Sequence, residues 1–224
     1  MLDAMLSSPL FGLTLSAAAW CAGLQVQKKI GRLPPLLTAA ALIIAVLALF
    51  RIPYSHYAAG GNFIKLMLGP VTAVLALNIY NQRIVLKEHF IPVLAGCLAG
   101  SLTSVGSILL LCRAFHVDDA LAASLLPKSV TTAIAIGIAE SRGGVGGIAA
   151  AAVMVAGLTG AVFAPLFARL FHITDPVAEG LAIGACSHAL GTTRAMEIGS
   201  VQGAMSSIAI CVCGILTSIL VLFL

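Results

Sequence analysis

Hydrophobic residues run along this chain in long charge-free stretches that are separated by short polar segments. Six of these stretches approach or exceed the roughly 20 apolar residues that a helix needs to cross a lipid bilayer. They cover residues 4–27, 33–50, 66–82, 91–112, 143–168 and 198–224. The pattern therefore predicts six transmembrane helices in an all-α polytopic membrane protein.

Two further apolar segments are interrupted. Residues 120–139 are broken in the middle by a Pro-Lys-Ser sequence at 127–129, and residues 180–193 form a segment of only 14 residues before Arg194. Apolar segments that are too short for a span are more often interrupted or re-entrant than simple crossings. The predicted architecture is six spans plus two broken or re-entrant segments. The pattern leaves open whether each broken segment crosses the membrane.

The composition agrees with lipid as the main solvent of this chain. Of its 224 residues, 60% are hydrophobic and 9% are charged, and the mean hydropathy is +1.10. A soluble domain carries about 25% charged residues. The net charge of +4 is spread over several loops, which argues against a nucleic-acid-binding surface. We expect a single integral membrane domain, with a helical hairpin over residues 1–65 and a repeat-containing transport core over residues 66–224.

Positive charges in the short loops predict the orientation of the helices. Loops on the cytoplasmic side of a membrane are enriched in lysine and arginine. The loops after the second and fourth spans carry Arg51 and Arg113. The connections after the first and third spans carry five basic residues, which are Lys28, Lys29, Arg32, Arg83 and Lys87. This bias predicts an external N-terminus and places the first and third connections in the cytoplasm.

A sequence repeat links the two interrupted segments. Residues 113–119 and 169–175 both read Arg-x-Phe-His and then end in aspartate, at an offset of 169 − 113 = 56. Residues 127–132 and 188–193 both end in Thr-Thr, at an offset of 61. Chance similarity between apolar segments is the alternative explanation. A unit of one helix and one broken segment, used twice, is a common way to build a central transport site.

The first break contains residue types suited to binding an anion. Lys128 near the centre of an apolar segment costs roughly 2.5–3.5 kcal/mol on insertion scales, so a water-filled cavity, a carboxylate or a bound anion must offset that cost. Pro127 breaks the helix because it lacks an amide hydrogen. Ser129, Thr131 and Thr132 supply hydroxyls. A helix that restarts here directs free amide groups and a partial positive charge at the break.

The second break is predicted from a Gly-Thr-Thr sequence. Gly191 is expected to end one half-helix in a left-handed conformation. Thr192 or Thr193 is expected to cap the half-helix that follows.

Ionisable residues surround this second break. Arg194 carries a permanent charge and a planar fork that suits a carboxylate, and Glu197 lies one helical turn further on. His188 is the candidate for proton coupling, because histidine titrates near neutral pH. Ser187 adds a hydroxyl beside it. Together with the first break, these residues predict an anion-binding site.

Each of these polar residues also has a purely structural explanation. Lys128 and Arg194 could extend their side chains to the membrane surface from the ends of half-spans. Arg194 and Glu197 could form a structural ion pair, and His188 could be a buried histidine with satisfied hydrogen bonds. The six cysteines are expected to pack as small apolar side chains, without a metal site or a cofactor. We do not expect an enzyme, since no nucleophile, carboxylate pair or metal cluster is placed for catalysis.

Three stretches resemble a known family. Residues 124–132 (SLLPKSVTT) and 185–197 (ACSHALGTTRAME) look like the two signature blocks of the LrgB/CidB family, and residues 203–207 (GAMSS) resemble the start of its last helix. The resemblance covers essentially the whole chain and is strongest from Leu121 onward. It implies a multi-pass protein of the bacterial inner (cytoplasmic) membrane that works with a smaller LrgA/CidA-type membrane subunit.

The resemblance implies two kinds of function. Members have been described as antiholin-like or holin-like modulators of murein hydrolase activity and cell lysis. Plastid relatives are glycolate/glycerate translocators, and bacterial pairs are associated with pyruvate movement. This chain departs from the family pattern at Ala133, where a proline is usual, and at residues 76–78, where Ala-Leu-Asn replaces Ala-Tyr-Pro. Both departures remove a helix breaker and leave the cationic and hydroxyl residues in place.

Taken together, the sequence predicts the membrane subunit of a small monocarboxylate transporter for an acid such as pyruvate, glycolate or glycerate. The alternative is an antiholin-like or holin-like modulator of murein hydrolase activity and lysis that acts through oligomers. The expected partners are the carboxylate anion, the LrgA/CidA-type subunit, lipid and further copies of this chain. The expected substrate-binding residues are Lys128, Ser129, Thr131, Thr132, Ser187, His188, Thr192, Thr193 and Arg194. A structural or gating role is assigned to Pro127, Gly191, Glu197 and Asn78.

Overall fold

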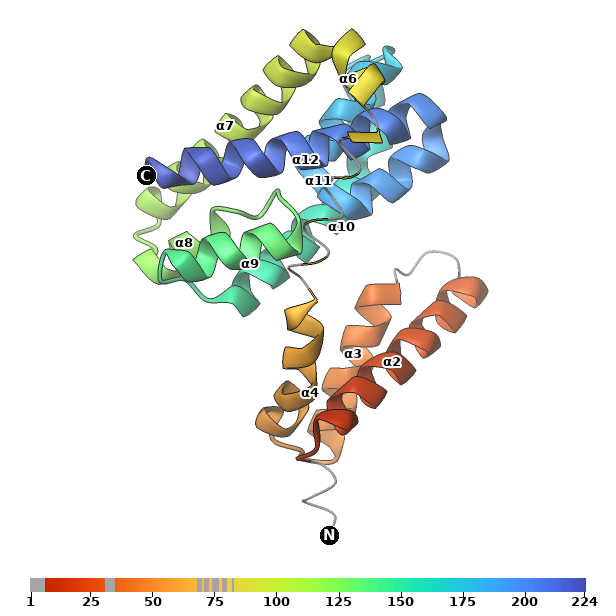
Figure 1. Cartoon of the computed structure of the whole chain (residues 1–224), viewed down its shortest axis with the longest axis vertical. Helices are drawn as coiled ribbons and strands as arrows, with labels where there is room; N and C mark the ends of the chain where they lie inside the picture. The colour runs from red at the N-terminus through yellow and green to blue at the C-terminus, as the bar shows by residue number, and fades with distance from the viewer. Residues whose placement is uncertain are drawn as a thin grey trace. The chain divides into compact units, whose positions relative to one another are not determined.

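The computed structural model describes residues 7–30, 35–67, 70, 73, 77, 80, 81 and 83–224. Every regular element within these ranges is an α-helix. The chain divides into two compact units, Met1–Pro70 and Val71–Leu224, which are described separately below (Figure 1).

Four of the described helices are long and apolar enough to cross a membrane: α2 (Pro9–Ile30), α7 (Phe90–Ala114), α10 (Gly146–Leu170) and α12 (Ser200–Leu222). Helix α3 (Pro35–Leu49) is equally apolar but has only 15 residues. These helices confirm the predicted class, an all-helical membrane protein. The third predicted span, residues 66–82, lies largely outside the described residues, as does Asn78. The count of six spans therefore stays a prediction.

In the first unit, α2 packs against both α3 and α4 (Tyr54–Leu66). Two glycines let α2 and α4 approach closely, because a Cβ added at Gly12 would lie 2.9 Å from the Cα of Gly60. The hydroxyls of Ser16 and Tyr57 are 3.0 Å apart and link the same two helices. Small residues at such crossings are typical of helix packing in membranes. Helix α4 falls in a segment with several polar residues, which the search for charge-free stretches does not identify as an element.

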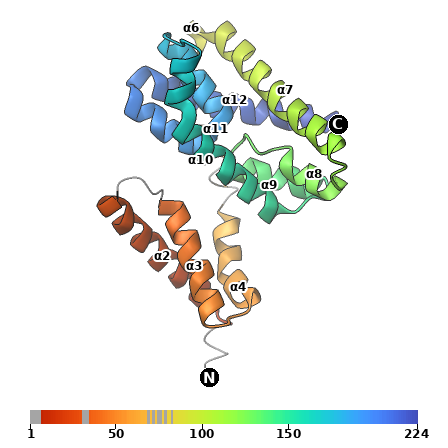
Figure 2. The same ribbon diagram turned by 180° about the vertical axis from the view of Figure 1, so that it is seen from behind.

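The second unit contains α6 (Arg83–Glu88), α7, α8 (Asp119–Leu125), α9 (Thr132–Ser141), α10, α11 (Pro176–Ile198) and α12. Helices α11 and α12 lie side by side, and α10 runs along α11 (Figures 1 and 2). A buried apolar cluster joins α7, α11 and α12. It consists of Val93, Cys97, Leu181, Ala185, Met205, Ile208, Ala209 and Cys213.

Glycines on α11 explain how closely that helix approaches α12. A Cβ added at Gly180 would lie 2.6 Å from the carbonyl oxygen of Gln202. A Cβ added at Gly184 would lie 2.7 Å from the Cβ of Ala209. Both positions lack room for a side chain, so the backbones of the two helices come into direct contact.

Two histidines in a left-handed conformation end α7 and α10. His116 has φ 50° and His172 has φ 52°. After each of them an amide bonds back to the carbonyl five residues earlier, at 2.8 Å in both turns, which is the pattern of a Schellman motif. The helices that follow are capped by Asp118 and Asp175, whose side chains accept hydrogen bonds from backbone amides. The two Arg-x-Phe-His sequences thus form turns with the same hydrogen bonds.

Candidate functional site

The first break lies where the sequence predicts it. Helix α8 ends at Leu125 and α9 begins at Thr132. The intervening turn is tightened by two backbone bonds of 3.2 Å, from the amide of Lys128 to the carbonyl of Leu125 and from the amide of Val130 to that of Pro127. Pro127 is fully buried and contributes no amide hydrogen.

Two serine hydroxyls hold the ammonium group of Lys128. Its Nζ donates to the Oγ of Ser129 at 3.2 Å and to the Oγ of Ser104 on α7 at 3.3 Å. The Ser104 hydroxyl also donates to Ser129, at 2.8 Å. Within the part of the chain that the structure describes, no carboxylate lies within 4.0 Å of this nitrogen. An ammonium group has three hydrogens to donate, so the two serines leave one available to a ligand.

The second break lies inside α11 and is centred on His188, whose φ of 41° and ψ of −140° are not helical. The prediction that Gly191 takes the left-handed conformation is therefore wrong. A side chain at Gly191 is excluded for a different reason, because an added Cβ would overlap the Cβ of Ser187. The ring of His188 stabilises the break, since its Nε2 donates to the carbonyl of Val153 on α10 at 2.7 Å.

Two glycines on α10 make room for this break. A Cβ added at Gly157 would lie 2.6 Å from the Nε2 of His188. A Cβ added at Gly160 would overlap the Oγ of Ser187. Both glycines face the two residues at which α11 changes direction, so the kinked segment can press against the α10 backbone. Neither glycine was identified from the sequence.

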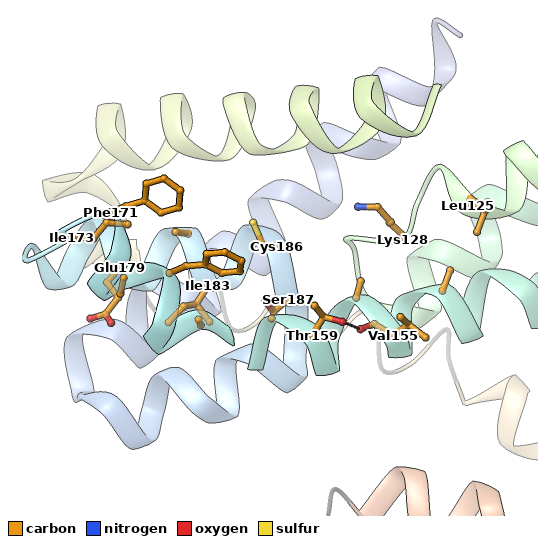
Figure 3. Close-up of a pocket in the computed structure, with 17 residues that line it drawn as sticks. Leu125, Lys128, Val155, Thr159, Phe171, Ile173, Glu179, Ile183, Cys186 and Ser187 are labelled. Carbon is orange, nitrogen blue, oxygen red and sulfur yellow. Dashed lines mark hydrogen bonds between the residues drawn. The ribbon is translucent and has the colours of Figure 1, made fainter. Parts of the chain in front are cut away.

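A cavity of about 840 Å³ lies beside both breaks, between the end of α8, α10 and α11 (Figure 3). The first break contributes Lys128 to its wall, and the second contributes Ser187. Ser187 is 1% exposed, and its Oγ has no hydrogen-bond partner among the described residues. Most of the remaining wall is apolar. The cavity thus places one cation, Lys128, beside a largely hydrophobic surface.

The predicted threonines lie around the breaks rather than on the cavity wall. Thr192 is buried, and its Oγ1 donates to the carbonyl of His188 at 3.0 Å and lies 2.7 Å from the Oγ of Ser206. Thr193 is exposed and donates to a carbonyl one turn earlier. Thr132 is also exposed, at the start of α9, and the buried Oγ1 of Thr131 has no partner among the described residues. The hydroxyls of Thr192 and Thr193 therefore satisfy backbone carbonyls near the second break.

Arg194 is not brought together with Lys128. Its Nη1 lies 2.6 Å from the Oε2 of Glu197, and both side chains are substantially exposed, at 44% and 59%. It lines a second hollow of about 500 Å³, which also includes Arg169 and His172. In this conformation the two cations that the sequence assigns to one site belong to two different hollows.

Two residues of the site were missed in the sequence. Ser104 lies in a charge-free span, where nothing marks one serine as the partner of a lysine 24 residues away. Glu179 lies in the first turn of α11 and lines both hollows. Its Oε2 accepts a hydrogen bond from the Nε2 of Gln202 at 3.1 Å. A carboxylate in the first turn of a helix is common for reasons of helix capping alone, so the sequence carries no specific signal there.

This geometry favours an anion. In a region of low dielectric constant a lysine without a carboxylate partner is costly, and a bound anion offsets that cost by charge pairing. The model of the LrgB-like family matches residues 16–224, which include both breaks and the whole cavity. The chain belongs to the LrgB-like family. The four apolar helices and this membership identify an integral membrane protein.

Several curated relatives align with this chain over nearly their full length. The chain is 38% identical to the uncharacterized protein YxaC of Bacillus subtilis (strain 168) over 206 residues, which are 91% of this chain and 90% of that protein. It is 37% identical to the antiholin-like protein LrgB of the same organism, with coverage of 96% and 94%. The antiholin-like protein LrgB of Bacillus mycoides (strain KBAB4) is 34% identical with the same coverage. No solved structure matches this LrgB-like chain.

Proposed function

We propose that this protein is the membrane subunit of a transporter for small monocarboxylates such as pyruvate, glycolate or glycerate. It would act in the bacterial inner membrane together with an LrgA/CidA-type subunit and as an oligomer. One observation carries the proposal: Lys128, which has no carboxylate partner among the described residues, lines a largely apolar cavity that extends to Ser187. These two residues come from two different helix breaks.

The electrostatics of Lys128 supports a ligand of single negative charge. Two neutral hydroxyls compensate part of the cost of keeping the ammonium away from bulk water, but they supply no opposite charge. A carboxylate of the substrate would supply it and would accept the remaining hydrogen of the ammonium.

The arrangement of the breaks supports transport rather than simple binding. Interrupted helices around a central site are how many transporters combine a binding site with a movable gate. The two Schellman turns at His116 and His172, each ahead of a broken segment, support an internal repeat as the origin of this arrangement. Movement of α10 against α11 would open the cavity to one side of the membrane at a time. In the described conformation His188 bonds to Val153 and Arg194 pairs with Glu197. Proton coupling by His188 and substrate binding by Arg194 would therefore take place in other conformations of the transport cycle.

The test is uptake of radiolabelled pyruvate, glycolate and glycerate into proteoliposomes that contain the purified protein, with and without its small partner. We expect saturable uptake by the wild type and a loss of at least about tenfold in the Lys128→Ala variant, because a hydrogen bond to a charged group contributes about 1.5–3 kcal/mol and tenfold corresponds to about 1.4 kcal/mol. Lys87→Ala is the matched control, since Lys87 is exposed on α6 and outside the cavity. Equal uptake by wild type and Lys128→Ala, with normal insertion, would overturn the proposal.

A second candidate function is modulation of murein hydrolase activity and lysis. It is favoured by a specific observation, the name antiholin-like protein LrgB that relatives with 34–37% identity carry. In that case the same proteoliposomes would take up none of the acids in a saturable way. They would instead leak unrelated solutes, and Lys128→Ala would leak as much as the wild type.

A further inference from the structure

We infer that the cavity accepts monocarboxylates whose apolar chain is longer than that of a three-carbon acid. It binds these acids more tightly than it binds short hydroxy or oxo acids. This inference rests on the proposed function and concerns the substrate class of the same site. Three features of the cavity support it: its size, the nature of its wall and the charges at its ends.

The cavity is much larger than a three-carbon acid requires. Its volume of about 840 Å³ is near the upper end of the roughly 300–1,000 Å³ of pockets that bury drug-sized ligands. A short acid bound at Lys128 would leave most of this volume without a ligand.

The wall beyond Lys128 is hydrophobic along most of its length. It includes the alanines of α10 at positions 152, 156, 164 and 168, and the larger side chains of Val155, Phe167, Phe171 and Ile183. Hydroxy groups of glycolate or glycerate would find few hydrogen-bond partners on this surface. An alkyl chain would instead bury its methylene groups against it.

The charges near the two ends of the cavity favour a ligand with one carboxylate over a ligand with two. Figure 3 shows Lys128 near one end of the group of lining residues, with Leu125 beyond it, and Glu179 near the other end, beside Ile173 and Phe171. A monocarboxylate would place its head at Lys128 and its apolar end toward Glu179. A dicarboxylate of the same length would bring a second negative charge to the carboxylate of Glu179, which is repulsive.

A native cysteine allows binding to be measured without transport. Cys186 lines the cavity between the two ends (Figure 3), so a bound ligand would shield it from alkylation by a small maleimide. Cys21 is exposed on α2, in the first unit, and serves as an internal control in the same sample. The other described cysteines are buried. Site-resolved mass spectrometry of the full-length protein in lipid nanodiscs would report both alkylation rates.

The first arm compares unbranched acids from propionate to octanoate at equal concentrations. We expect the concentration that halves the alkylation rate of Cys186 to fall about fourfold per added methylene, until the chain fills the cavity. The rate at Cys21 should stay constant throughout. Octanol and octanedioate are the matched controls for octanoate, and both should protect at least about tenfold less well, since one lacks the charge and the other has a second one.

Two substitutions test the ends of the cavity. In Lys128→Met octanoate should lose its advantage over octanol, because the head group no longer finds a cation. In Glu179→Gln octanedioate should protect nearly as well as octanoate, while the isosteric side chain keeps the hydrogen bond with Gln202. These two responses would assign the preference for a carboxylate to Lys128 and the rejection of a second carboxylate to Glu179.

The outcomes separate the inference from the proposed function. Uptake and Cys186 protection by pyruvate or glycolate that depend on Lys128, with no gain along the acid series, would overturn the inference and leave the proposed function standing. Equal protection by octanol and octanoate would also overturn it and would identify a cavity filled by apolar molecules such as lipid chains. Absence of both uptake and protection by every acid would overturn the proposed function and the inference together.

Discussion

Lys128 shows how a charged side chain is kept in an apolar region of this protein. Its ammonium group is solvated by the hydroxyls of Ser129, its sequence neighbour, and of Ser104 from α7. A direct bond of 2.8 Å links the two serine oxygens that accept from the lysine. A hydrogen bond to a charged group contributes more than one between neutral groups. The serine pair is therefore part of what makes this lysine tolerable, whether or not a ligand is bound.

We expect Ser104→Ala to lower the free energy of unfolding by about 1.5–3 kcal/mol, the usual contribution of a hydrogen bond to a charged group. The measurement is equilibrium unfolding of the purified protein in mixed micelles, followed by circular dichroism. The cost should largely disappear in a Lys128→Met background, because the methionine leaves no charge to solvate.

Ser107→Ala is the matched control for Ser104→Ala. Its hydroxyl lies on the same helix, is exposed and donates only to a backbone carbonyl. We expect a change below about 0.5 kcal/mol, as is usual for exposed positions. If both serine variants were equally stable in the wild-type background, the solvation of Lys128 by Ser104 would be refuted.

The sequence predicted which residue types occur at the site, but it did not predict which neighbours their side chains face. A lysine beside a proline in an apolar segment is unusual enough to be identified from the sequence alone. Whether Thr192 faces a ligand or another helix depends on how α11 packs, and it bonds to Ser206 of α12. Whether Arg194 faces a ligand also depends on this packing, and here its side chain pairs with Glu197 one turn away. Side-chain contacts across helices are set by tertiary packing, which the local sequence does not encode.

Helices α10 and α11 show how an element is shaped by its neighbour. The break in α11 is stabilised by α10, through the carbonyl of Val153, and it fits only because α10 has glycine at positions 157 and 160. The break in the first segment needs no such neighbour, since Pro127 interrupts the helix through its own covalent structure. The predicted break at residues 127–129 therefore lies inside the observed one, between Leu125 and Thr132. The second was assigned to Gly191 instead of His188, because the cause lies on another helix.

We expect Gly160→Ala to destabilise the protein by about 1–3 kcal/mol, because the new methyl group would overlap Ser187 and force α10 and α11 apart. Gly106→Ala on α7 is the control, since a Cβ there meets no atom within 4 Å. The Gly106→Ala variant should be as stable as the wild type or more stable by up to about 1 kcal/mol, because alanine favours the helix more than glycine does.

The double variant Gly160→Ala/Ser187→Gly tests the contact itself. Removing the side chain of Ser187 removes the atoms that the methyl group would meet. Thermal unfolding should show that the double variant recovers most of the stability lost in Gly160→Ala. Additive losses in the double variant would mean that the two residues do not compete for the same space.

At the scale of the whole molecule, the positive charges predict which loops face the cytoplasm. Alkaline phosphatase fused after Lys29 should be inactive, because this connection is expected in the cytoplasm. The same enzyme fused after Ile52 should be active outside. Replacing Lys28 and Lys29 by glutamine should weaken this difference. High activity after Lys29 in the unaltered chain would show that the orientation is the reverse.

The sequence by itself determined that lipid solvates this protein, that its elements are helices, that a cationic break interrupts one apolar segment and that the chain resembles the LrgB/CidB family. These properties are local, since they depend on the length of apolar stretches, on single residues such as Pro127 and Lys128, and on short motifs. Only the tertiary structure decided that Lys128 and Ser187 share a cavity, that Ser104 holds the lysine and that Arg194 belongs to another hollow. The reason is physical: a cavity is formed where helices distant in sequence approach one another, and that approach is set by glycine contacts and buried packing that no single segment contains.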